Sequence, residues 1–243
     1  MMNNYYSCII NTLLLLGIVY GIPVQDINNR PIIGVLAQHF HPSNPLPDTP
    51  GDSFIAASYV NYLQAAGARV VPIKINEDPK VIENLLKNIN GVLFPGGDSY
   101  VLDSPYQRNA KAAFDYSKSQ KEAGNVFPLW GTCLGMQQLS ALAAETDSIL
   151  TASKGTWDAS MKLDNISTSA SMMENMPGDI REILSNEMVT YNAHYNCVSV
   201  EDFNDNKKLQ NFFQMTSTNF DSNGKEFVSG IEGKRISHCA KNT

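Results

Sequence analysis

Short apolar runs alternate with longer stretches of helical periodicity along the first half of the chain. The apolar runs predict strands at residues 31–37, 68–73, 91–94 and 127–130. The other stretches predict helices at 54–66, 79–88, 107–123 and 136–144, with Gly67 ending the first helix and Pro79 opening the second. This alternation predicts an α/β fold of three layers, in which a parallel sheet is covered by helices on both faces.

The second half is less regular. Residues 151–171 mix Ser, Thr, Asp and Asn with scattered apolar positions, which favours an antiparallel excursion, and residues 201–213 favour a loop with a short helix. Residues 215–217 and 226–231 predict a hairpin, because the stretch Asp221-Ser222-Asn223-Gly224 between them is a strong turn signal. No internal repeat, low-complexity tract or domain-scale linker interrupts the sequence.

Composition and charge narrow the classes of function. The 243 residues are 43% hydrophobic and 17% charged, as expected of one globular domain with a large core. A formal net charge of −6 and the lack of a basic run argue against a nucleic-acid partner.

Residues 1–21 are predicted to be a signal peptide. The apolar run at 9–22 is too short to span a bilayer comfortably, so we expect no stable membrane insertion. No Lys or Arg precedes this run, and a retained anchor is the alternative. Secretory entry predicts a secreted or lysosomal protein, in which Asn165-Ile166-Ser167 is an available glycosylation sequon.

The stretch Gly131-Thr132-Cys133-Leu134-Gly135 joins a predicted strand to a predicted helix and has the pattern of a nucleophile elbow. Such a turn is so sharp that side chains two residues before and after the nucleophile would collide, so both positions need glycine. The turn places the Cys133 sulfur at a helix N-terminus, where the dipole and free N–H groups favour a thiolate. The alternative is a buried cysteine in a glycine-containing turn.

A second loop strengthens this interpretation. The strand at 91–94 ends in Pro95-Gly96-Gly97, where no side chain blocks the approach of backbone to a reacting carbonyl. It lies about 35 residues before the cysteine, a separation that suits an intervening helix. Together the two loops predict an oxyanion hole with one N–H from Gly97 or its neighbour and the other from Leu134.

The cysteines and histidines lack the spacing of metal ligands, so no metal site and no cofactor are expected. Cys8 lies in the predicted signal peptide, and the odd number that remains leaves at least one unpaired thiol. Cys133 is the natural candidate for the free thiol, and a Cys197–Cys239 bridge stays open.

These residues resemble the γ-glutamyl hydrolase family, the folate polyglutamate hydrolases of the class I glutamine amidotransferase-like group. The resemblance rests on Arg30–Val35, Ser58–Val60, Ala66–Ile73, Asn90–Gly97, Pro128–Gly135, Asn192–His194 and Phe227–Gly233. It covers a domain at residues 30–233 and leaves a divergent tail at 234–243. It implies a flavodoxin-like parallel sheet and a hydrolase that cleaves folate poly-γ-glutamates, a small-molecule substrate, through a thioester on Cys133.

The family's general base is a histidine in a Trp-His-Pro-Glu stretch, and no such stretch occurs in these 243 residues. The resemblance therefore implies that the C-terminal strand region is truncated and that activity is severely reduced or absent. His238 is a candidate substitute, although no Glu follows it. His194 matches a family histidine near the substrate cleft, so we expect active-site contact from it rather than the role of the base. His39 and His41 are expected in a solvated loop.

Two other functions stay open. One is a class I glutaminase subunit that makes ammonia for a partner synthase, and the other is a catalytically dead isoform that binds folate tails or dimerises with full-length protein. A homodimer also stays open. A polyanionic glutamate tail needs cations or N–H donors, and the candidates are Lys74, Arg108, Lys111 and Lys154, each of which can equally be a surface charge.

Overall fold

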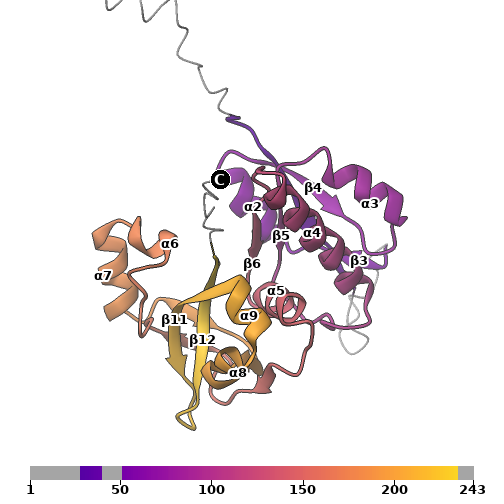
Figure 1. The fold of residues 1–243 in the computed structure, drawn as a ribbon. Coiled ribbons are helices and arrows are strands. Elements are labelled where there is room, and N and C mark those ends of the chain that lie inside the picture. The colour runs from indigo at the N-terminus through magenta and orange to yellow at the C-terminus, as the bar shows by residue number, and fades with distance from the viewer. Residues whose placement is uncertain (1–27, 40–50, 235–243) are drawn as a thin grey trace, which may run out of the picture.

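A parallel sheet of four strands runs through the first half of the chain (Figure 1). The computed structural model describes residues 28–39 and 51–234. The strands lie in the order β4-β1-β5-β6. Their bounds are β1 (Ile32–Leu36), β4 (Arg69–Ile73), β5 (Gly91–Phe94) and β6 (Leu129–Gly131).

Helices connect these strands and cover both faces of the sheet. They are α2 (Ala57–Ala65), α3 (Pro79–Leu86), α4 (Pro105–Glu122) and α5 (Leu134–Ala144). Connections between parallel strands are right-handed, so the step from β1 out to β4 puts α2 on one face. The return across β1 to β5 and β6 puts α3 and α4 on the other face, where they pack together. The predicted three-layer α/β fold is confirmed.

Local signals set the helix ends. The carboxylate of Asp78 accepts the N–H of Lys80 at 2.7 Å to cap α3, and the hydroxyl of Ser104 accepts the N–H of Gln107 at 3.0 Å to cap α4. Helix α2 ends before Gly67, which has φ +89°, as predicted. It begins later than predicted, because Phe54 pairs with Gln38 in a short antiparallel pair of strands. These are β2 (Gln38–His39) and β3 (Ser53–Phe54).

The second half forms three antiparallel strand pairs. The first two join β7 (Leu150–Ala152) to β10 (Asn196–Val198) and β8 (Ala159–Met161) to β9 (Thr190–Asn192), which confirms the predicted excursion. The third is the predicted hairpin of β11 (Phe213–Phe220) and β12 (Glu226–Gly233). The remaining helices are α6 (Ser171–Glu174), α7 (Gly178–Asn186), α8 (Val200–Asp205) and α9 (Lys207–Phe212).

The hydrophobic core fixes α5 firmly in place. Leu134 and Leu139 of this helix are buried with Phe94 of β5, Tyr106 of α4 and Leu209 of α9. Because α5 packs on the sheet, on α4 and on α9, the residue at its start has little freedom to move. That residue is Cys133.

Several sequence predictions lie outside the described residues. These are the signal peptide at 1–21, the tail beyond Lys234, and Cys8, His41, His238 and Cys239. Within the described residues, no helix is both long and apolar enough to cross a bilayer.

Candidate functional site

Cys133 lies at the point where β6 turns into α5, with φ +52° and ψ −113°. A residue with a side chain is strained in this conformation. A Cβ on Gly131 would lie 2.6 Å from the carbonyl carbon of Gly135, and a Cβ on Gly135 would lie 2.0 Å from the backbone oxygen of Phe94. The contact between Gly131 and Gly135 is the one that the spacing predicted, and the contact of Gly135 with Phe94 comes from the packing of α5 on β5.

Two backbone N–H groups act on the Cys133 sulfur. Burial raises the pKa of the thiol, and hydrogen bonds from the N–H of Leu134 and from the N–H of Gly97 act in the opposite direction. The Leu134 N–H is available because it belongs to the first turn of α5 and has no carbonyl partner within the helix. The two N–H groups expected in an oxyanion hole therefore both approach this sulfur.

The Gly96-Gly97 loop is held by two side chains from distant parts of the chain, Gln38 of β2 and Tyr59 of α2. Gln38 is buried; its Nε2 donates to the backbone oxygen of Gly96 at 2.8 Å, and its Oε1 accepts the N–H of Asp98 at 3.2 Å. The hydroxyl of Tyr59 accepts the N–H of Gly96 at 2.8 Å. With these neighbours bonded, the Gly97 N–H remains directed at the sulfur.

The pKa of the Tyr59 hydroxyl depends on its burial and on the charge of Cys133. Burial raises this pKa, the Gly96 N–H lowers it, and a negative charge on Cys133 raises it further. The phenol therefore stays protonated at neutral pH, and its hydroxyl hydrogen is free to donate while its oxygen accepts from Gly96.

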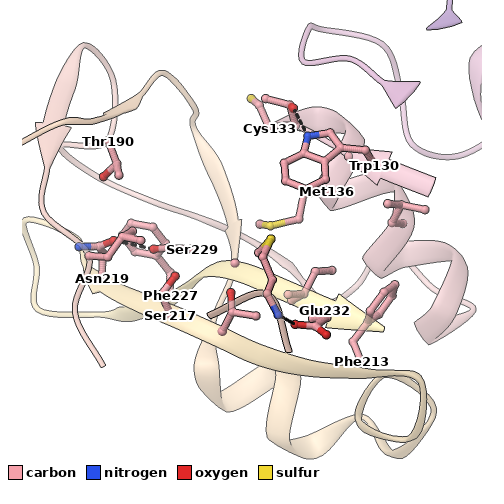
Figure 2. A pocket seen from close by; sticks show the side chains of 18 of the residues that line it. Trp130, Cys133, Met136, Thr190, Phe213, Ser217, Asn219, Phe227, Ser229 and Glu232 are labelled. Carbon is pink, nitrogen blue, oxygen red and sulfur yellow. Dashed lines mark hydrogen bonds between the residues drawn. The ribbon is translucent and has the colours of Figure 1, made fainter. Parts of the chain in front are cut away.

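Two cavities meet at Cys133. The first, of about 490 Å³, lies between β6 and the β11–β12 hairpin. Figure 2 shows Trp130, Cys133 and Met136 on one side of it and Phe213 and Glu232 on the hairpin side. The second, of about 730 Å³, contains the Gly97 loop and the start of α5. Thr132, Cys133, Tyr191, Ala193 and His194 line both.

His194 is held on the wall that the two cavities share. Its backbone N–H donates to the oxygen of Thr156 at 3.1 Å, its Nε2 lies 3.2 Å from Oδ1 of Asn192, and its ring packs edge-on against Phe227. Burial lowers the pKa of the imidazole, and a backbone group of Asn196 acts the other way. The structure thus brings His194 and Cys133 to the same cavities, with His194 neutral at pH 7.

The sequence profile of the family described as Peptidase C26 matches residues 31–204, which includes the elbow, the glycine loop and His194. The chain belongs to the Peptidase C26 family. The match covers the whole parallel sheet and the antiparallel pairs that carry His194.

Curated proteins with similar sequences carry one activity name. The chain is 38% identical to γ-glutamyl hydrolase B of Dictyostelium discoideum over 213 residues, covering 87% of this chain and 61% of that protein. It is 41% identical to the γ-glutamyl hydrolase of Homo sapiens over 214 residues, covering 87% of this chain and 65% of that protein. The chain therefore spans less than two thirds of the length of these relatives.

The fold also has a solved counterpart. The glutaminase domain of Trypanosoma brucei CTPS, solved with bound acivicin, superposes with a TM-score of 0.51 at 14% identity. The match covers 83% of this chain and 80% of that one. This likeness places the Peptidase C26 chain in a glutaminase-like, flavodoxin-like fold.

The cations considered for a polyanionic substrate lie elsewhere. Arg108 donates to the backbone oxygen of Ile75, and Lys111 pairs with Asp115 on the surface of α4. Neither these two nor Lys74 and Lys154 line either cavity. Over residues 28–39 and 51–234, no group of three or more His, Cys, Asp or Glu side chains is placed to hold a metal ion.

Sequence reasoning assigned no role at the site to Gln38 or Tyr59. Each is a polar group in an otherwise apolar context, Gln38 just after a buried strand and Tyr59 on the apolar side of a predicted helix. A buried polar group needs a hydrogen-bond partner, so the sequence indicates that Gln38 and Tyr59 have partners, but it does not indicate which groups these are.

Proposed function

We propose that this chain hydrolyses γ-glutamyl bonds of folate poly-γ-glutamates, with Cys133 as the nucleophile. The observation that carries the proposal is the approach of the Leu134 and Gly97 N–H groups to the Cys133 sulfur. The names of the curated relatives support the bond type. No cofactor is needed for this chemistry.

In the first half-reaction the Cys133 thiolate attacks the γ-carbonyl carbon. The carbonyl oxygen becomes an oxyanion that accepts hydrogen bonds from the N–H groups of Gly97 and Leu134. Its collapse expels the amine of the next glutamate, which takes up a proton, and leaves a thioester on Cys133. Water then attacks the thioester carbonyl, which releases the γ-carboxylate and regenerates the thiol.

We propose further that the chain by itself turns over slowly. Among the described residues no imidazole hydrogen-bonds the Cys133 sulfur, and burial favours the protonated thiol. General acid–base assistance raises reaction rates by about 10²–10⁴-fold, and a thiol without a neighbouring base lacks this increase. His194 is proposed to contact the substrate in this site, since it lines both cavities.

The test is release of glutamate from a folate poly-γ-glutamate by the purified chain, beside Cys133→Ala and the matched control Cys197→Ala. We expect slow release that Cys133→Ala abolishes and Cys197→Ala retains, with an acyl-enzyme on Cys133 visible by mass spectrometry. Equal release by the native chain and Cys133→Ala would refute the role of the cysteine. Ammonia release from free glutamine faster than glutamate release would favour the glutaminase alternative.

Secretion or delivery to a lysosome is proposed from the N-terminal sequence alone, and a homodimer is proposed as the assembly to test. Cleavage after residue 21 in a secreting cell, read by N-terminal sequencing, tests the first. Sedimentation velocity over a range of protein concentrations tests the second.

A further inference from the structure

Two large aromatic rings stack face to face on the surface beside the candidate site. The ring centroids of Trp157 and Tyr195 are 4.5 Å apart and their planes differ by 3°. Both side chains are largely exposed, Trp157 by 56% and Tyr195 by 64%. Exposed aromatic surface of this size, held in a parallel stack, is suited to receive another flat ring.

The stack is built on a rigid base. Trp157 lies between β7 and β8, and Tyr195 lies between β9 and β10. Directly beside the rings, the Ser153 N–H donates to the oxygen of Tyr195 at 2.8 Å, and the Thr156 hydroxyl donates to the oxygen of His194 at 2.8 Å. These bonds tie the two loops together, so a ligand that stacks on the rings does not have to order them.

Both rings line the larger cavity, the one of about 730 Å³ that also contains Cys133, Gly97 and Leu134. Tyr100 and Tyr191, which are also exposed, widen the aromatic surface of the same cavity. A cavity of this volume has the size of a small-molecule site. The stack therefore belongs to the space that a substrate of Cys133 would enter.

The charged residues of this cavity also favour an aromatic ligand group. Among the lining residues that the structure describes, Asp98 is the one Asp or Glu, and there is no Lys or Arg. Within the described part of this lining an anionic glutamate tail therefore finds no Lys or Arg to pair with, whereas a flat, apolar ring can stack on Trp157.

We propose that Trp157 and Tyr195 form a stacking platform for a planar aromatic group carried by the substrate beyond the scissile γ-glutamyl bond. The proposal rests on the proposed function only in taking Cys133 as the reacting end of the cavity. It assigns to Trp157 and Tyr195 the selection of γ-glutamyl conjugates that carry an aromatic head.

The test is direct binding to the Cys133→Ala chain, measured by calorimetry with two probes. The first is 4-aminobenzoyl-glutamyl-γ-glutamate and the second is γ-glutamyl-glutamate, which lacks the ring. Stacking on an aromatic side chain predicts that the aromatic probe binds on the order of tenfold more tightly. Trp157→Ala and Tyr195→Ala are each expected to remove most of this preference, and Trp157→Phe to retain most of it.

Tyr62→Ala is the matched control, because Tyr62 is 57% exposed on α2 and lines neither cavity. It should leave the preference unchanged. The chain holds two tryptophans, so a Trp130→Phe background makes Trp157 the sole indole, whose fluorescence the aromatic probe should quench. Equal binding of the two probes, or a preference that survives Trp157→Ala, would overturn the proposal.

Two further outcomes separate this proposal from the proposed function. If the chain releases no glutamate but keeps a Trp157-dependent preference for the aromatic probe, the platform stands and the hydrolase assignment falls. If release proceeds and Trp157→Ala leaves the preference intact, only the platform falls. A dimer that Trp157→Ala converts to monomer would show that the stack binds a second copy of the chain, which also overturns the platform.

Discussion

The side chain of Gln38 packs so closely on Gly97 that no side chain fits at position 97. A Cβ built on Gly97 would sit 1.8 Å from Oε1 of Gln38, the atom that accepts the N–H of Asp98. The same Gln38 side chain donates to the oxygen of Gly96, so it sets the path of the loop on both sides of Gly97. The direction of the Gly97 N–H thus depends on a side chain from the strand after β1.

Gly97→Ala is therefore expected to push Gln38 aside and turn the Gly97 N–H away from Cys133. Loss of one oxyanion donor lowers catalytic rates by about 10²–10³. The buried amide of Gln38 would also lose its partners, which costs about 1–3 kcal/mol of unfolding free energy. Glutamate release and urea denaturation measure the two effects. Gly178→Ala is the control, since a Cβ there meets no atom within 4 Å; equal effects of both changes would contradict the prediction.

Gly135→Ala is expected to destabilise the fold rather than only the site. Its Cβ would lie 2.0 Å from the backbone oxygen of Phe94, which belongs to the central strand β5 and cannot move aside as a flexible side chain can. Overpacking in a core costs about 1–3 kcal/mol, and a backbone contact belongs at the upper end. Urea denaturation gives the loss. A midpoint within experimental error of the native chain would show that α5 can shift from the sheet.

The Cys133 thiol is expected to react slowly at neutral pH. Burial raises its pKa above the ordinary 9.0, so the thiolate is a minor species at pH 7 and its fraction rises with pH. The rate of alkylation by iodoacetamide, followed by mass spectrometry on Cys197→Ala, should climb to a midpoint above pH 9.0. A plateau below pH 8 would reveal a cationic partner for the sulfur.

His194 makes stability depend on pH in a definite direction. Burial holds its folded pKa below the ordinary 6.5, so the unfolded chain binds the proton more readily. The contribution of neutral His194 to the free energy of unfolding is complete above pH 6.5 and is lost as the pH falls through the folded pKa. His194→Gln should flatten the unfolding free energy between pH 7 and pH 5. A slope that stays the same in His194→Gln would contradict the prediction.

The parts of the site that sequence reasoning found are those set by contacts between near neighbours in the chain. The collision between Gly131 and Gly135 spans a single turn, so the spacing of two glycines around Cys133 is enough to predict it. The hairpin turn is equally local, because Asp221 accepts the N–H groups of Asn223 and Lys225. Contacts between residues a few positions apart can be predicted from the order of the residues alone.

The parts that it missed join distant residues. Gln38 and Gly96 are 58 positions apart, and Tyr59 and Gly96 are 37 apart. Only the packing of α2 and the order of the strands bring these partners together. For the same reason the sequence could not decide whether Arg108 and Lys111, at the start of a predicted helix, face the site. In the structure neither lines either cavity.

From the sequence alone follow the α/β alternation, the elbow at Cys133 and the hairpin, because each depends on periodicity or on a turn of a few residues. The two glycine loops also predicted that the Gly97 and Leu134 N–H groups serve one site. The tertiary structure alone decided that Gln38 and Tyr59 hold the Gly96-Gly97 loop and that Trp157 stacks on Tyr195. These relationships depend on how sheet, helices and antiparallel pairs pack, and burial acts between surfaces rather than between neighbours in the chain.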